Sequence, residues 1–183
     1  MVCWIFHTYD YYERATDTNA RYDMVGLIKF LSEWIFNIDK FNKCPFAKKS
    51  WDDDRCKVIM VEDFTLDNFW SIVSEECMIY DSSKHDAVIV AALTDDEIIN
   101  VMQLSGSCDS MNTFLNSQSK DLWLLKQYGD PYTLVIIQKI TDLDDASRIL
   151  EKQGYYNRYI PYIFNKSILR RRQMRERLTG AIK

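Results

Sequence analysis

The sequence predicts a single α/β domain, 1–183, built as a layered sandwich with a small, mostly parallel sheet of three or four strands and flanking helices. Three β-rich apolar runs, 57–61, 87–93 and 132–140, are separated by segments of helical periodicity. Strands joined through helices favour parallel crossovers. The chain has only 5 glycines and 3 prolines, so no linker divides it. A ferredoxin-like α+β arrangement is the alternative.

The first third of the chain predicts a short strand, a long helix and a second strand. The segment 2–6 has weak strand character. From residue 24 to residue 41, apolar side chains recur at helical spacing and form one continuous stripe, which predicts an amphipathic helix. A charged loop, 48–55, then leads to the strand at 57–61.

The middle of the chain repeats the order of strand and helix. Thr65 is a predicted N-cap, and the apolar positions from 66 to 77 predict a helix behind it. The run 87–93 is apolar without alternation, which is typical of a strand covered on both faces at the sheet centre. The acidic residues 95–97 are expected at the start of a short helix that ends at Ser105-Gly106-Ser107.

The last third is expected to contain two helices, one strand and a basic terminal helix. Apolar residues from 111 to 125 favour a helix, and 129–131 a turn before the strand at 132–140. Thr141 is expected to cap a helix through Leu150 that Gly154 closes. The segment 165–183 is expected to form the basic C-terminal helix.

Composition favours a soluble, cytoplasmic protein. Apolar residues make up 47% of the chain, yet no apolar run is long enough to span a bilayer, and the N-terminus lacks the basic flank of a signal peptide. Five cysteines at irregular spacing do not resemble a disulfide framework, so we expect reduced thiols. We expect no membrane association.

One short motif carries a resemblance to a known family. The run 42–48, Asn-Lys-Cys-Pro-Phe-Ala-Lys, follows the long helix, and Pro45 should end that helix. This run resembles the N-x-C-P-F-A-K motif of a family of short bacterial and plant proteins classed as a domain of unknown function. The resemblance implies a fold and an evolutionary relation, without an activity. The histidine-proline pairs of that family are replaced here by Leu93-Thr94 and Lys139-Ile140.

Five residues are candidates for a ligand site: Asn42, Cys44, Lys48, Asn157 and Arg158. Asn157 and Arg158 resemble an N-R-x-P-Y run of the same family, and an arginine among tyrosines can stack on rings and bind a carboxylate. Cys44 is a candidate nucleophile if it shares a pocket with Arg158. The alternative is that Cys44 is a core residue, since a thiol at a helix C-terminus is not activated by the helix dipole.

The basic tail is the candidate surface for a partner. Between residues 165 and 183 there are seven basic residues and one acid, whereas the first 164 residues carry a net charge of −10. Arg171, Arg172 and Arg175 are the residues we expect to contact an acidic protein surface, and the alternative is a solvated helix. The acidic body makes nucleic acid an unlikely partner.

The leading hypothesis for function is a small cytosolic accessory or regulatory binding protein. No zinc spacing, phosphate-binding glycine loop or dinucleotide motif occurs, so we expect no metal and no cofactor. Neither of the two histidines has a sequence context that marks it as a catalytic base. The alternative is a small-molecule-binding protein or an enzyme with a pocket near Cys44 and Arg158.

Overall fold

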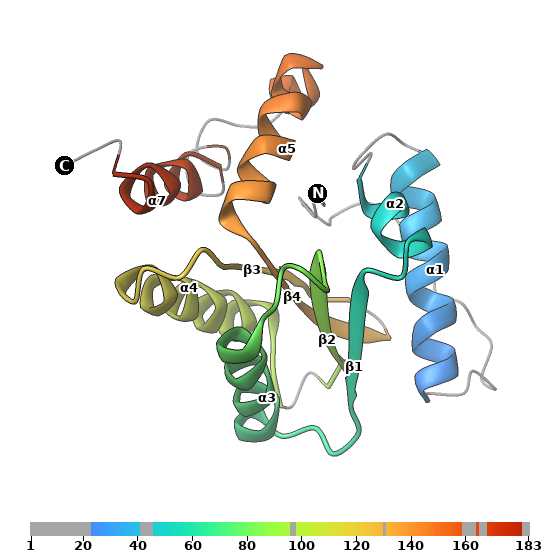
Figure 1. Ribbon diagram of the computed structural model, residues 1–183. Coiled ribbons are helices and arrows are strands. Elements are labelled where there is room, and N and C mark those ends of the chain that lie inside the picture. Colours follow the sequence, from blue (N-terminus) through green and yellow to red (C-terminus); the bar gives the residue numbers. More distant parts are fainter. Residues whose placement is uncertain are drawn as a thin grey trace.

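A computed structural model of the chain describes residues 23–40, 46–95, 98–129, 131–158, 164 and 168–180. Helices lie on both faces of one four-stranded sheet, so the predicted α/β class is confirmed (Figure 1). The strand predicted at 2–6 lies outside the described residues. The elements are α1 (Met24–Lys40), α2 (Ala47–Asp52), β1 (Cys56–Val61), α3 (Leu66–Ile79), β2 (Ala87–Leu93), α4 (Val101–Ser117), β3 (Trp123–Gln127), β4 (Tyr132–Gln138), α5 (Ile140–Lys152), η1 (Tyr155–Arg158) and α7 (Arg170–Leu178).

The sheet is mixed, with the strand order β1-β2-β4-β3. β1 and β2 are parallel, with Cys56 opposite Ala87, and α3 connects them. β4 is antiparallel to β2 and to β3, so it is the one described strand that runs against the other three. β2 has a neighbour on each side and is buried over most of its length, which confirms its predicted place inside the sheet.

The prediction of a parallel crossover into the third β-rich run was wrong. The chain forms an additional strand, β3, where the sequence analysis placed the end of a helix. Because a loop of only four residues joins β3 to β4, the two strands form an antiparallel hairpin. Because of this hairpin, β4 runs antiparallel to β2, the strand beside it in the sheet.

The two helices predicted between residues 95 and 107 and between residues 111 and 125 are in fact one helix, α4, so their predicted bounds were also wrong. α4 begins at Val101 behind Asn100, whose Oδ1 accepts hydrogen bonds from the backbone N–H groups of Met102 and Gln103, each at 3.0 Å. The Gln103 side chain accepts in return from the Asn100 backbone, which completes a capping box. The helix then continues through Gly106, because the buried positions after it keep their helical spacing against the sheet.

The other predicted helices are present with small differences at their ends. Thr65 caps α3 as expected, and its Oγ1 accepts from the Asn68 backbone at 3.2 Å. Thr141, however, is inside α5, whose cap residue is Lys139. The carboxylate of Asp121 accepts hydrogen bonds from the Thr141 N–H and hydroxyl, so a residue from before β3 satisfies the first turn of α5.

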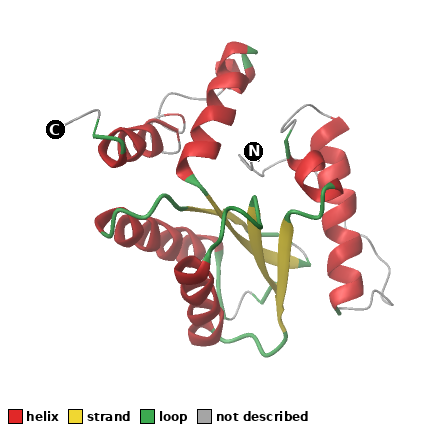
Figure 2. Ribbon diagram, in the orientation of Figure 1, coloured by secondary structure: helices red, strands yellow, loops and turns green. Residues whose placement is uncertain are grey.

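The sheet separates two hydrophobic cores. Alternate residues of the strands point to opposite faces, so Val88 and Val90 pack with α3 and α4, whereas Ile89 packs with α1 and α5. Figure 2 shows the resulting layers, with helices on either side of the strands. Within the described part of the chain, no helix combines the length and the apolar character needed to cross a bilayer.

Asn112 attaches α4 to the edge strand β3. Its side-chain amide donates to the Leu124 carbonyl at 3.0 Å, and its Oδ1 accepts from the Leu124 N–H at 2.7 Å. β3 has a neighbouring strand only on its β4 side. The Asn112 side chain therefore takes the place that a fifth strand would occupy, and it satisfies both outward backbone groups of Leu124.

Gln138 is a buried polar residue for which a stability change can be predicted. Its side chain at the end of β4 is 0% exposed, and neither Oε1 nor Nε2 has a hydrogen-bond partner among the described residues. Replacing Gln138 with methionine, which has a similar shape, should raise the free energy of unfolding by about 1–2 kcal/mol. The midpoint of urea denaturation, measured by circular dichroism, would show this increase.

Gln127→Met is the matched comparison. The Gln127 side chain is buried as well, but its Nε2 donates to the Tyr128 carbonyl at 3.4 Å. Its replacement should therefore stabilise the protein less than Gln138→Met does. A lower denaturation midpoint for Gln138→Met would mean that the Gln138 amide is satisfied in solution.

Candidate functional site

The residues predicted for a ligand site are only partly within the described structure. Asn42 and Cys44 lie outside the described residues. Lys48 is in α2 and pairs with Asp52 one turn later. Asn157 is exposed in η1, which Arg158 ends, and the described part of the structure does not extend to the Arg158 side chain. The pocket that would unite these residues stays a prediction.

Residues next to Lys48 and Asn157 in the sequence belong to the same hydrophobic core. Ala47, beside Lys48, and Tyr156, beside Asn157, are buried in the same core cluster. That cluster also contains Ile89 and Ile136 from the sheet. The end of α2 nearest the motif and the 3-10 turn η1 are therefore placed over the same face of the sheet.

The alternative interpretation of the basic C-terminal segment, a solvated helix, was wrong. Arg171 is only 1% exposed, and it donates to the Leu143 carbonyl of α5 at 3.3 Å. Met174, one turn later on the same side of α7, packs with Leu143 and Ile140. α7 is therefore a docked element of the fold, and Arg171 is not available to an external partner.

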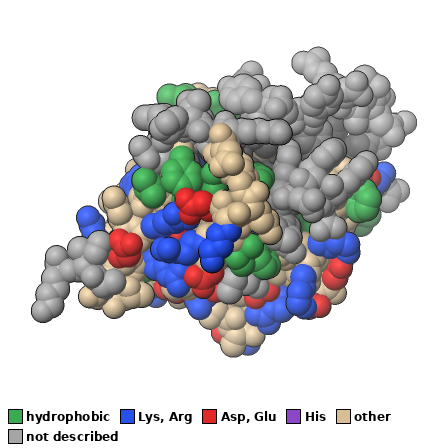
Figure 3. All heavy atoms as spheres, turned by 90° about the horizontal axis from the view of Figure 1, so that it is seen from above, with side chains coloured by type: hydrophobic (Ala, Val, Ile, Leu, Met, Phe, Trp, Pro, Cys, Tyr) green, Lys and Arg blue, Asp and Glu red, His purple; other side chains and the backbone are tan. Residues whose placement is uncertain are grey.

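Arg172 and Arg175 contact α5 through one buried carboxylate. Asp144 is 0% exposed, and it accepts from Arg172 Nε at 3.1 Å and from a terminal nitrogen of Arg175 at 2.9 Å. Arg148, on α5 itself, donates to the same carboxylate at 3.1 Å. α5 and α7 lie at the top of Figure 1, and the view from above shows basic and acidic side chains interleaved on that face (Figure 3).

The surroundings of Asp144 decide its ionisation. Burial alone would raise the pKa of Asp144, because it disfavours the charged form. The hydrogen bonds from Arg175 and Arg148, together with the charges of Arg148 and Arg172, outweigh that effect and hold the pKa below its ordinary value. Arg148, Arg172 and Arg175 thus already form ion pairs with an acidic group of the protein itself.

The described cysteines are unsuited to nucleophilic chemistry. Cys56, Cys77 and Cys108 are free thiols. Burial is the main cause that raises the pKa of each of them to about 12. Because the thiolate is the reactive form, these three side chains are inert at neutral pH.

A polar cluster at the start of β2 also has a structural role. Asp86 accepts from Arg55 at 2.8 and 2.9 Å and from the Ser50 hydroxyl at 2.6 Å. These contacts connect α2 and the loop before β1 to the first residues of β2. His85, just before this cluster, is partly buried, and its carbonyl accepts a hydrogen bond from the Tyr80 hydroxyl.

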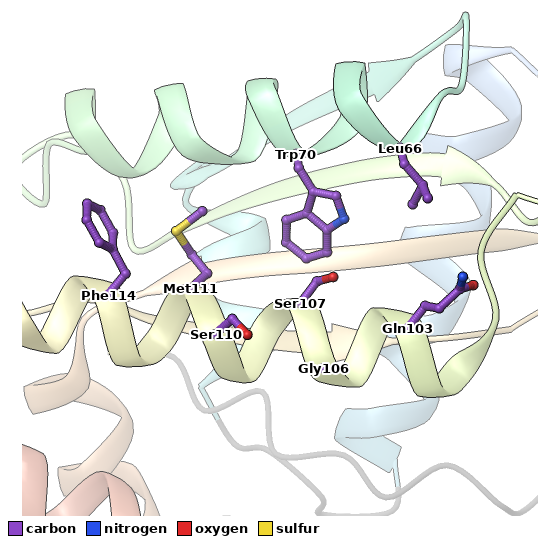
Figure 4. Close-up of a pocket in the computed structure, with 8 residues that line it drawn as sticks. All are labelled: Leu66, Trp70, Gln103, Gly106, Ser107, Ser110, Met111 and Phe114. Atoms are coloured by element: carbon purple, nitrogen blue, oxygen red, sulfur yellow. The ribbon is translucent and has the colours of Figure 1, made fainter.

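An open groove among the described residues lies between α3 and α4, with a volume of about 680 Å³. The two helices run in the same direction, and the groove follows them from their N-terminal ends towards Phe114 (Figure 4). Its walls combine large apolar side chains on both helices with small or polar residues on α4. The lining residues are Leu66, Trp70, Gln103, Gly106, Ser107, Ser110, Met111 and Phe114.

Trp70 forms the central part of the α3 wall. Its ring points from α3 towards Ser107 on α4 (Figure 4). The ring packs edge-on against Phe69, with centroids 5.5 Å apart and planes at 88°, so the buried Phe69 fixes its position. The indole Nε1 is buried without a hydrogen-bond partner among the described residues.

The groove was missed because its residues fit the periodic pattern of the core. Leu66 and Trp70 share helical spacing with Phe69 and Val73, so the sequence predicts all four on the same apolar face of one helix. The structure buries Phe69 and Val73 completely but leaves Leu66 and Trp70 partly exposed. A weak signal was present in α4, where small and hydroxyl residues interrupt the apolar positions.

Comparisons of the whole chain with family models, with curated proteins and with solved structures find no match. The resemblance of residues 42–48 to an uncharacterised family therefore stays a prediction. The geometry of the α3–α4 groove is therefore the basis on which a function can be proposed.

Proposed function

We propose that this protein is a cytoplasmic accessory or regulatory binding module that holds an apolar segment of a protein partner in the α3–α4 groove. One observation carries the proposal: Leu66, Trp70, Met111 and Phe114 line an open groove of about 680 Å³. Exposed apolar surface that is gathered in one place is typical of interaction sites. The free thiols of the three described cysteines support a reducing compartment.

The exposure of the groove favours a macromolecule over a small ligand. Small-molecule pockets of this volume usually enclose most of the ligand surface. Here Phe114, a large apolar side chain at one end of the groove, is 51% exposed. A small ligand would leave much of this surface open to solvent, whereas a protein segment would cover it.

The rival reading, an enzyme or small-molecule protein with a pocket near Cys44 and Arg158, has less support. The described neighbours of those residues share one core cluster, but no described side chain forms a reactive pair there. The groove offers apolar contact and hydroxyl groups without an activated nucleophile, which suits binding better than catalysis.

Blocking the groove should abolish binding while the fold is kept. Ser110 is exposed on its α4 wall, so Ser110→Trp should fill the groove without disturbing the core. Peptides would be selected from a displayed random library against the native protein, with counter-selection against Ser110→Trp. We expect selected peptides with two or more large apolar residues, and at least about tenfold weaker binding to Phe114→Ser.

Met78→Ser is the control, because Met78 is exposed on α3 but does not line the groove. Isotope-labelled methionine methyl groups give a direct readout, since the Met111 signal should move when peptide binds. No enrichment after the counter-selection, or a Met111 signal that does not move when an enriched peptide binds, would contradict a binding role for the groove.

A further inference from the structure

We infer that the occupant of the α3–α4 groove is an amphipathic helix of a partner protein, with its apolar stripe flanked by lysine or arginine, and that this helix crosses α4 at Gly106. The inference depends on the proposed function, because it specifies what the same groove binds. Three features support it: the shape of the groove, the space at Gly106 and the acidic residues beside one end of the groove.

The shape of the groove suits a helix better than an extended chain. From Gln103 to Phe114 the groove follows α4 for roughly 16 Å, at about 1.5 Å per residue, which is about three turns. An amphipathic helix places anchors at i, i+3 or i+4, and i+7 along one face, which matches a groove of this length. An extended peptide gains its affinity by pairing with a sheet edge, whereas both walls here are helices whose backbone groups are already paired.

Gly106 is unexplained by the packing of the chain itself. A Cβ atom built at this position would meet no heavy atom within 4 Å. Glycine inside a helix nevertheless costs about 0.5–1 kcal/mol relative to alanine. Small residues on a helix surface allow a second helix to approach closely, and Ser110 lies one turn further on in the same wall. The empty space at Gly106 is therefore where we place the crossing.

Acidic residues at one end of the groove favour a basic helix. The lining residues of the groove are themselves uncharged. Glu62, Asp63 and Asp67, however, are exposed within four residues of Leu66, at the N-terminal end of α3, and neither α3 nor α4 contains a lysine or an arginine. A partner with lysine or arginine beside its apolar stripe would complement these acids and associate faster at low salt.

The basic helix of the chain itself is not the occupant in this structure. Arg172 and Arg175 of α7 are paired with Asp144 on α5. Arg170 donates to Thr113 at 2.8 Å and lies 3.8 Å from Asp109, and neither residue lines the groove. The basic side chains of α7 are thus engaged elsewhere, so α7 is not the helix that we place in the groove.

The first test uses the peptides selected for groove-dependent binding. We expect them to carry apolar residues at helical spacing with flanking lysine or arginine, and to become helical by circular dichroism when the protein is added. Their affinity should fall as salt rises, and that dependence should be shallower for the triple variant Glu62→Gln, Asp63→Asn, Asp67→Asn. Groove-dependent peptides that are acidic or bind in an extended form would overturn this inference and leave the proposed function standing.

The second test separates binding from stability at the crossing point. Gly106→Ala should raise the thermal midpoint of the free protein, because alanine favours the helix. The same substitution should lower the affinity for the selected peptides by at least about tenfold, because the added methyl group fills the space where the peptide helix crosses α4. Ser117→Ala is the control, since it also favours the helix but lies outside the groove. If the Gly106→Ala variant is more stable and still binds the peptides with native affinity, the proposal that the helix crosses α4 at Gly106 is wrong.

Discussion

Replacing Asp144 with alanine should lower the free energy of unfolding by about 3 kcal/mol. Asp144 is fully buried and accepts from Arg172 and Arg175 of α7, so its removal leaves these guanidinium groups facing a cavity. Removing one partner of a buried ion pair costs about 3–5 kcal/mol. We expect the lower end, because Glu151 and Asp145 would still contact the two arginines. Urea denaturation measures the change.

Glu151→Gln is the control, since this carboxylate is exposed and its pair with Arg172 should contribute little. Acid denaturation gives a second readout. Because the pKa of Asp144 is lowered in the folded protein, its contribution is complete above the ordinary carboxyl pKa and is lost as the pH falls through the lower folded value. Asp144→Asn should remove that part of the pH dependence. Equal stability of native and Asp144→Ala proteins would contradict the role of this carboxylate in docking α7.

Asn112→Ala should have an effect of similar size at the opposite face of the sheet. The substitution leaves the N–H and the carbonyl of Leu124 without the amide that satisfies both of them. Each unsatisfied buried group costs about 1–3 kcal/mol, so the two groups together should cost about 2–6 kcal/mol in the free energy of unfolding. Hydrogen exchange of the Leu124 amide should accelerate by more than that of amides in β4.

Asn116→Ala is the matched control, because Asn116 is one turn later on α4 and is less buried. Asn112→Asp tests the two hydrogen bonds to Leu124 separately. The aspartate keeps an acceptor for the Leu124 N–H, but it replaces the donor with an oxygen that repels the Leu124 carbonyl. It should therefore destabilise the protein as well. Unchanged protection of the Leu124 amide in Asn112→Ala would show that β3 is held at its edge by other contacts.

The sequence predicted the elements whose periodicity is long or unambiguous. α1 and α3 were found from apolar stripes, and β2 from an apolar run without alternation. β3 was missed because it has five residues and because Leu122 and Leu125 also have helical spacing. Without β3 the hairpin was invisible, so the direction of β4 could not be derived.

The sites were harder to predict than the fold, because they depend on contacts between distant segments. Asp144 and Glu151 are seven residues apart on α5, which gives an acidic stripe, and Arg172 and Arg175 are three apart on α7. The sequence contains both stripes but no indication that they meet. The groove depends in the same way on the separation of two helices, and Trp70 has the same periodicity whether it is sealed in the core or open.

The position of β4 in the sheet has a consequence for biosynthesis. β4 is the last described strand to be translated, yet it lies inside the sheet and is buried at all of its residues. While a ribosome is still making residues 94–131, β1, α3 and β2 can assemble, but the inner edge of β2 has no partner. Unpaired apolar strands of this kind associate with other chains. The nascent protein therefore depends on rapid delivery of β4, or on a chaperone, until the sheet is complete.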